Sequence, residues 1–147
     1  MFPVGGGKDE MNAKEYLEQI QLLDVKIQQD LERLEEMKHS ALGMRAIRYD
    51  TDKVQVSPSD KLCADTARII DFDEYINREI DRFTDQKERV IQQIQGMSNA
   101  NHVKLLFKVY VQYKTLKQAA AEMKISYSYS VELHKKALQT FETIYLT

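Results

Sequence analysis

Glycine and proline are scarce in this sequence, with five and two among its 147 residues. Sheets of many short strands need frequent turns, so this scarcity favours long helices. No apolar run approaches the roughly 18 residues of a membrane-spanning helix, so we expect no membrane partner. The opening MFPVGGGKDE lacks the long apolar region of a signal peptide, and its glycines predict a flexible leader over residues 1–10.

Cysteine is nearly absent, which excludes an internal disulfide framework and fits a reducing cytoplasm. The single Cys63 has no local histidine partner, because His39, His102 and His134 lie elsewhere in the chain. We therefore expect a buried or unreactive thiol. The sequence also has no glycine-rich phosphate loop, metal-ligand cluster or nucleophile–base pair. These absences predict no enzyme, no catalytic residue, no metal and no cofactor.

The charge is unevenly distributed along the chain, although the net charge is only −2. Residues 11–96 contain thirteen Lys/Arg and eighteen Asp/Glu, whereas residues 97–147 contain seven Lys and three Glu, a net of +4. A basic end on an acidic body can direct one face towards a polyanion such as nucleic acid.

Two long segments, residues 11–42 and 59–96, have apolar residues at helical spacing. We expect the first helix to end at Gly43. The second follows a heptad from Ile76 that only Lys87 interrupts, which is typical of coiled coils. Neither helix can bury its stripe alone, so we predict a long antiparallel, coiled-coil-like hairpin, with homodimerisation through these helices as an open alternative. The expected stripes are Leu17, Ile20, Leu23, Ile27, Leu31, Leu34, Met37 and Ala41, then Ile69, Phe72, Ile76, Ile80, Phe83, Val90, Ile94 and Met97.

The predicted domains are the leader, a hairpin over residues 11–96 with a connector at 43–60, and a C-terminal module over 97–147. In the connector, KVQV suggests a short extended piece, and Pro58 prevents one continuous helix. Ser59 or Asp60 can cap the helix that follows.

The C-terminal module predicts three short helices. Asn99 or Asn101 can cap HVKLLFKVYVQY, Thr115 begins LKQAAAEM, and a last helix starts near residue 127. Two helices with a three-residue joint form a helix-turn-helix. Their close crossing requires small residues, which Ala119 and Ala120 supply. We expect Met123, Ile125 and Leu133 to form a small core at this joint, and Ser126 to cap the last helix.

In a helix-turn-helix, the first turns of the second helix contact base edges. Hydroxyls and a helix N-terminus can hold phosphates, and lysines supply salt-dependent attraction. Lys114 is a further lysine close to the motif, and it would add to this attraction. The predicted DNA-binding residues are Lys117, Lys124, Ser126, Tyr127, Ser128, Val131, Glu132, Lys135 and Lys136.

A second interpretation of the same segment is a helical hairpin in an ordinary bundle. Tyr129 and Tyr145 would then cover the small core. Under either interpretation we expect His134 to be a hydrogen-bonded core histidine rather than a metal ligand. The apolar stripe expected on the last helix consists of Tyr127, Val131, His134, Leu138, Phe141 and Tyr145.

Longer motifs carry a family resemblance. The C-terminal half contains LLFKVYVQYKTLKQAAAEMKIS, then LHKKAL and Phe141, and the first half contains YLEQI and MRAIRYDTDKVQVSPSDK. Together they resemble the ArpU/RinA group of late transcription regulators of bacteriophages and prophages, over nearly all of residues 11–142. The sequence departs from that pattern at the turn, where Lys124 replaces a small residue, and at Ser130 and Glu132 in a helix that is often aliphatic and basic.

The resemblance implies a C-terminal helix-turn-helix similar to region 4 of sigma factors. It implies a prophage-encoded transcription regulator in the cytoplasm of a bacterial host, associated with the nucleoid. Its partners would be double-stranded promoter DNA and host RNA polymerase. Two alternatives stay open: a helical adaptor that binds protein instead of DNA, and a DNA-packaging protein similar to small terminases, a class in which the helix-turn-helix more often comes first.

Overall fold

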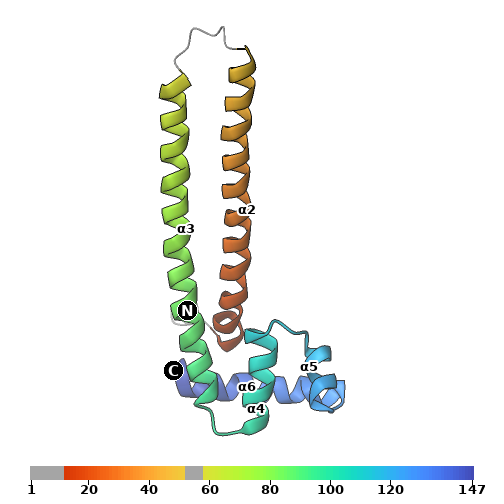
Figure 1. Ribbon diagram of the computed structural model, residues 1–147. Coiled ribbons are helices and arrows are strands. Elements are labelled where there is room, and N and C mark those ends of the chain that lie inside the picture. Colours follow the sequence, from red (N-terminus) through yellow and green to blue (C-terminus); the bar gives the residue numbers. More distant parts are fainter. Residues whose placement is uncertain (1–11, 52–57) are drawn as a thin grey trace, which may run out of the picture. The chain divides into compact units, whose positions relative to one another are not determined.

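The structure, a computed structural model, describes residues 12–51 and 58–147 (Figure 1). Within these residues every regular element is a helix, so the predicted all-α class is confirmed. The expected leader and the KVQV stretch lie outside the described residues. The elements are α2 (Ala13–Thr51), α3 (Pro58–Gln95), α4 (Ala100–Leu106), the π-helical η1 (Phe107–Val111), α5 (Leu116–Met123) and α6 (Tyr127–Tyr145).

The first helix is longer than the sequence suggested. α2 continues through Gly43 to Thr51, so the expected helix end at Gly43 is wrong. One glycine inside a helix costs only about 0.5–1 kcal/mol, and its neighbours in LGMRA are mostly good helix formers. α3 starts at Pro58, because the fixed φ and missing N–H of proline suit the first helical turn. Ser59 and Asp60 therefore lie inside the helix, and the expectation that one of them caps it is wrong.

The described residues fall into two compact units. One comprises residues 24–82 and contains the adjoining stretches of α2 and α3. The other comprises residues 12–23 together with 83–147. The first turns of α2 and the last turns of α3 therefore share a core with the C-terminal helices.

In the unit of residues 24–82, α2 and α3 run antiparallel and side by side (Figure 1). Ile27 and Leu34 of α2 and Ile76 of α3 are buried, as their apolar spacing predicts. The Arg33 guanidinium lies 4.8 Å from the centroid of the Phe72 ring. A cation over an aromatic face adds to the apolar contact between the two helices.

In the other unit, α6 contributes the largest buried side chain. Phe141 is fully buried, with ring centroids 5.9 Å from Tyr16 and 4.9 Å from Tyr145. Next to it, Glu142 Oε2 accepts a hydrogen bond from the Ala13 backbone N–H at 3.0 Å, which satisfies one of the free N–H groups at the start of α2. The core around Phe141 consists of Ala13, Leu17, Ile20, Val90, Ile94, Met97, Leu106, Tyr110, Val111 and Ala137.

Lys87, which interrupts the heptad of α3, lies against aromatic rings. Its Nζ is 5.4 Å from the centroid of Phe83 and 5.5 Å from that of Tyr113. The aliphatic stem of a lysine can cover apolar surface while its ammonium faces a ring. Lys87 can therefore occupy this position of the α3 heptad repeat and still pack against its neighbours.

Candidate nucleic-acid interface

A short turn with a left-handed residue joins α5 to α6. α5 begins with a capping box, in which Thr115 Oγ1 accepts from the Gln118 N–H at 3.1 Å and Gln118 Oε1 accepts from the Thr115 N–H at 2.9 Å. At its other end, Lys124 adopts φ 61° and ψ 43°, and the Ile125 N–H donates to the Ala120 carbonyl at 3.0 Å. Ser126 then caps α6, as predicted, because its Oγ accepts from the Tyr129 N–H at 3.1 Å.

Lys124→Gly is expected to stabilise the protein. The left-handed conformation costs a residue with a Cβ roughly 1–2 kcal/mol, while glycine loses about 0.4–1 kcal/mol through the freedom of the unfolded chain. The expected net gain is about 0.5–1 kcal/mol in the free energy of unfolding, measured by urea denaturation. Lys124→Ala is the matched control, since it removes the same charge but keeps the Cβ. An equal gain in both variants would contradict backbone strain at this position.

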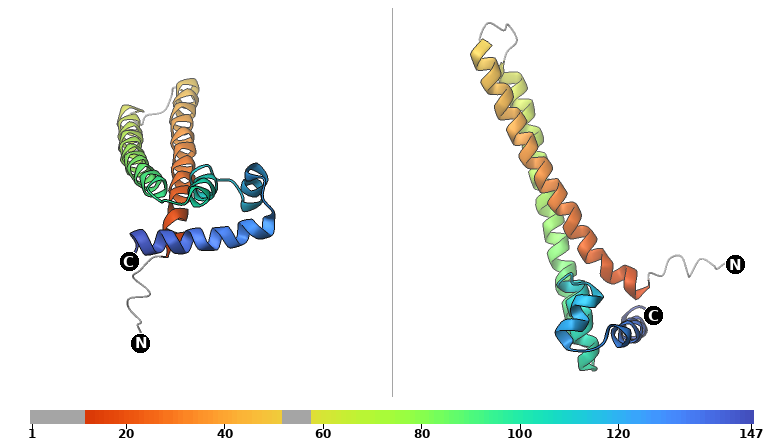
Figure 2. Two further views of the ribbon diagram at one scale, coloured as in Figure 1. Left: turned by 90° about the horizontal axis from the view of Figure 1, so that it is seen from below. Right: turned by 90° about the vertical axis from the view of Figure 1, so that its right-hand side faces the viewer.

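The crossing of α5 and α6 has the small residues that its geometry requires. Ala119 and Ala120 are 0% and 3% exposed, and Leu133 of α6 is 5% exposed. α5 and α6 are in direct contact, and α6 also contacts α4. Figure 2 shows the course of α6 from two further sides. Met123 and Ile125 pack against this small cluster. The expected core at the joint is thus confirmed.

The buried face of α6 differs from the expected apolar stripe. Tyr127 and Val131, which were placed on that stripe, are 56% and 36% exposed. Ser130 is fully buried instead, and its hydroxyl donates to the Tyr127 carbonyl at 2.6 Å. A small residue whose hydroxyl is hydrogen-bonded within its own helix can be buried and allows another helix to approach closely. A stripe defined by apolar residues alone does not include such a serine. The buried residues of α6 are Ser130, Leu133, Ala137 and Phe141.

The outer face at the start of α6 is open to solvent. Ser128, Glu132 and Lys135 follow one another at intervals of four and three, so they share one face of the helix. Tyr129, the proposed cover of the small core, is 48% exposed and does not cover it. All the predicted DNA-binding residues are exposed: Lys117, Lys124, Ser126, Tyr127, Ser128, Val131, Glu132, Lys135 and Lys136.

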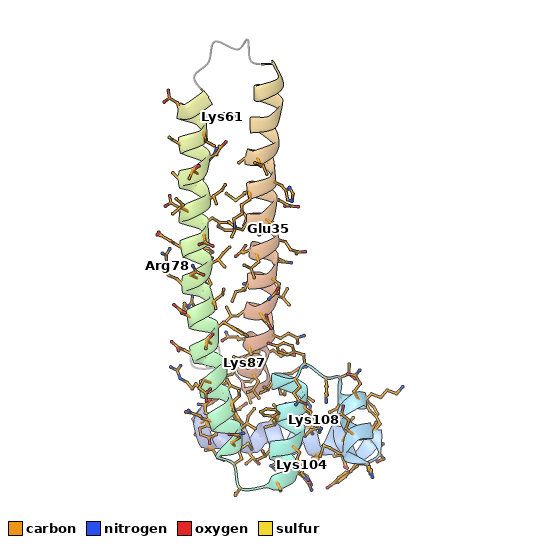
Figure 3. The ribbon with its side chains drawn as sticks, viewed as in Figure 1. Glu35, Lys61, Arg78, Lys87, Lys104 and Lys108 are labelled. Carbon is orange, nitrogen blue, oxygen red and sulfur yellow. The ribbon has the colours of Figure 1, made fainter. Side chains whose placement is uncertain are left out.

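The lysines near this face differ in their pairing. Glu122 Oε1 accepts from Lys108 Nζ at 2.6 Å and from Lys114 Nζ at 2.7 Å (Figure 3 labels Lys108). The hydrogen bond from Lys108, then that from Lys114, holds the pKa of Glu122 below its usual value. Lys114 was expected among the lysines that attract DNA. It instead pairs with Glu122 of α5, as Lys108 of η1 does.

His134 is a partly buried, hydrogen-bonded residue, which agrees with the expectation from the sequence. Its Nε2 lies 2.7 Å from the Tyr110 hydroxyl, and the two rings stack with centroids 5.8 Å apart. Burial, then the nearby charge of Lys14, lowers the pKa of His134, while burial and then Glu18 raise the pKa of Tyr110. Both shifts favour the neutral forms, so a protonated tyrosine hydroxyl and a neutral imidazole share this hydrogen bond, and the histidine tautomer decides which of them donates.

The stability of the fold is expected to fall below about pH 6.5, the usual histidine pKa. The pKa of His102 is lowered as well, by burial and then by Lys136. Both histidines bind protons more weakly when folded, so their contribution is complete above the unfolded pKa and is lost as the pH falls towards the folded one. Urea denaturation between pH 5 and 7.5 measures this. The variant His102→Gln with His134→Gln should be flatter over that window, and an unchanged slope would contradict the assignment.

Some features of this surface escaped the sequence reading. Gln139 is exposed one turn beyond Lys135 on the same face. Its spacing of four residues from Lys135 could have placed it on this face from the sequence alone. The Glu122 pairing had no such signal, because its two lysines come from other elements.

Cys63, expected to be buried or unreactive, is exposed.

In the described parts of the chain, no group of three or more His, Cys, Asp and Glu residues could hold a metal ion. None of the helices in those parts combines the length and apolar character that crossing a membrane requires. Comparison with family models, curated proteins and solved structures gives no match to this chain.

Proposed function

We propose that this chain is a prophage-encoded transcription regulator, in which α5 and α6 form a sigma region-4-like helix-turn-helix that binds double-stranded DNA. One observation carries the proposal: the outer face of the first turns of α6 is exposed, while Ser130 and Leu133 on its inner face are buried. A recognition helix needs this division, because its inner face must be fixed before its outer face can enter the major groove.

The exposed side chains offer base-edge chemistry. A carboxylate can accept from the N4 amino group of cytosine, so Glu132 favours C·G pairs. Lys135, one turn further, can donate to guanine, and the apolar Val131 can contact a thymine methyl group. Together these contacts would select a short mixed sequence.

Attraction to phosphates would come from lysines on both helices. Lys117 lies in the first turn of α5, the helix that crosses the backbone in this geometry. Lys124, Lys135 and Lys136 lie on the turn and on α6. Ser126 and Ser128 add hydroxyls that can bind phosphate oxygens. Glu132 opposes this attraction, so we expect moderate affinity.

Fluorescence anisotropy with a labelled duplex tests the proposal. Each phosphate contact contributes about −0.9 to the slope of log affinity against log salt, so engagement of the four lysines predicts a slope of about −3 to −4. An affinity that does not change with salt concentration, or no binding at low salt, would contradict the proposal that this chain binds DNA.

The regulatory role needs a separate test in the host cell. Genome-wide footprinting of the tagged protein should give occupancy at promoters, next to or overlapping the site of RNA polymerase. Occupancy at one packaging site in phage DNA would favour a function similar to small terminases.

A protein-binding adaptor is the second candidate, and the exposed aromatic residues favour it. Tyr127 and Tyr129 are 56% and 48% exposed on the same helix tip. Tyrosine is enriched at protein interfaces, where its ring gives a large contact at low entropic cost. Under this alternative Tyr127→Ala would abolish binding to RNA polymerase, and the protein would have no affinity for DNA.

A further inference from the structure

An open groove lies between α2 and α3 in the unit of residues 24–82. It consists of two adjoining hollows of about 390 and 350 Å³, which share Arg33, Met37 and Arg68. Met37, with Ile69 of α3, provides a half-buried apolar floor, and Phe72 extends it. Two helices cannot fully cover such a floor by themselves, so a further element is needed to bury it.

The rim of this groove carries equal numbers of opposite charges. Lys61, Asp65, Arg68 and Asp71 alternate in sign along α3, and Figure 3 labels Lys61 at the start of that helix. On the α2 side, Arg33 faces the groove with Glu36. A balanced rim does not select a polyanion or a polycation. It is instead complementary to a surface with the same alternation.

We propose that the groove binds a second copy of this chain, with the two α3 helices antiparallel across a two-fold axis near residues 66 and 67. In this register Arg68 of each copy lies opposite Asp65 of the other, and Lys61 lies within one residue of the position opposite Asp71. Asp65 and Arg68 already pair within one chain, so the contact forms a network of four charges around the axis. A parallel arrangement would place identical charges opposite each other, which is unfavourable.

This dimer goes beyond DNA binding and does not depend on it. Paired helical hairpins would bury the floors of both grooves, as in a four-helix bundle. An isologous contact closes after two copies, so the assembly stops at the dimer. The dimer would also carry two copies of α6, as recognition of a palindromic site requires.

Sedimentation equilibrium of the full chain tests the proposal directly, with a reversible dimer as the expected result. Tyr75→Lys at the edge of the groove should weaken dimerisation roughly tenfold or more, because it buries an additional charge in the contact. Ile70→Lys is the matched control, since Ile70 is 53% exposed and does not line the groove, whereas Tyr75 is 42% exposed. Both changes lie on exposed positions, and circular dichroism confirms that each variant is folded.

Charge exchange tests the antiparallel register. Arg68→Asp alone places two carboxylates together and should dissociate the dimer, and Asp65→Arg should do the same with two cations. The combined Asp65→Arg and Arg68→Asp variant should restore association. A wild-type monomer at every concentration, equal effects of Tyr75→Lys and Ile70→Lys, or a combined variant as weak as the single ones would each overturn the proposal. So would dimerisation that appears only after residues 1–10 are removed, since the leader would then occupy the groove.

Discussion

Charge reversal at Lys135 and Lys136 is expected to abolish DNA binding while the fold stays intact. Both side chains are exposed on α6, so their replacement by glutamate removes no buried contact. Each lost contact to a charged group costs about 1.5–3 kcal/mol, so losing two weakens binding by roughly 100-fold or more. The two new carboxylates add repulsion from the phosphates. Anisotropy at low salt measures the affinity.

The control for this variant is Lys26→Glu with Lys38→Glu. It changes the net charge by the same amount at exposed positions of the unit of residues 24–82. If overall charge governed DNA binding, the two variants would lose affinity equally. We expect the control to stay near the wild-type value, and equal losses would contradict a specific role of α6.

Phe141→Ala is expected to cause the largest loss of stability. Phe141 is fully buried among α2, α3 and α6 side chains, including Tyr16 and Tyr145. Truncation of a buried phenylalanine costs about 3–5 kcal/mol, because apolar contacts are lost and a cavity is left. That is a large part of the 5–15 kcal/mol that is typical of a folded domain. Urea denaturation gives the free energy of unfolding.

Ile144→Ala is the matched control on the same helix. Ile144 is 51% exposed, so its truncation should change the free energy of unfolding by less than about 0.5 kcal/mol. A small effect of Phe141→Ala would show that α6 does not dock on the first turns of α2. If Phe141→Ala instead unfolds the protein, its loss of DNA binding follows from unfolding, so affinity is compared only among folded variants.

The helices and their caps were largely predictable from the sequence because local chemistry determines them. Asn99 accepts from the N–H groups of Asn101 and His102, and Thr115 and Ser126 cap α5 and α6 as expected. The alanine pair at the helix crossing was predictable too, since close approach requires small side chains. In these cases a short motif contains all the atoms that make the contact.

The unpredicted features depend on residues distant in sequence or on small polar groups. The buried face of α6 includes Ser130, which an apolar count does not select. The Glu122 pairing depends on how η1 lies against α5, and the π-helical turn itself has no sequence signal here. The continuation of α2 past Gly43 depends on its neighbours, because one glycine is a weak stop signal.

DNA binding by α6 is tested most directly by an NMR titration of the labelled full chain with a short DNA duplex at low salt. We expect the largest amide shift changes over residues 124–136, with a second group near Lys117. Residues at the α2–α3 groove, such as Met37 and Ile69, should not respond. Shift changes confined to α2 and α3, or none at all under these conditions, would contradict the central claim that the exposed start of α6 is a DNA-binding surface.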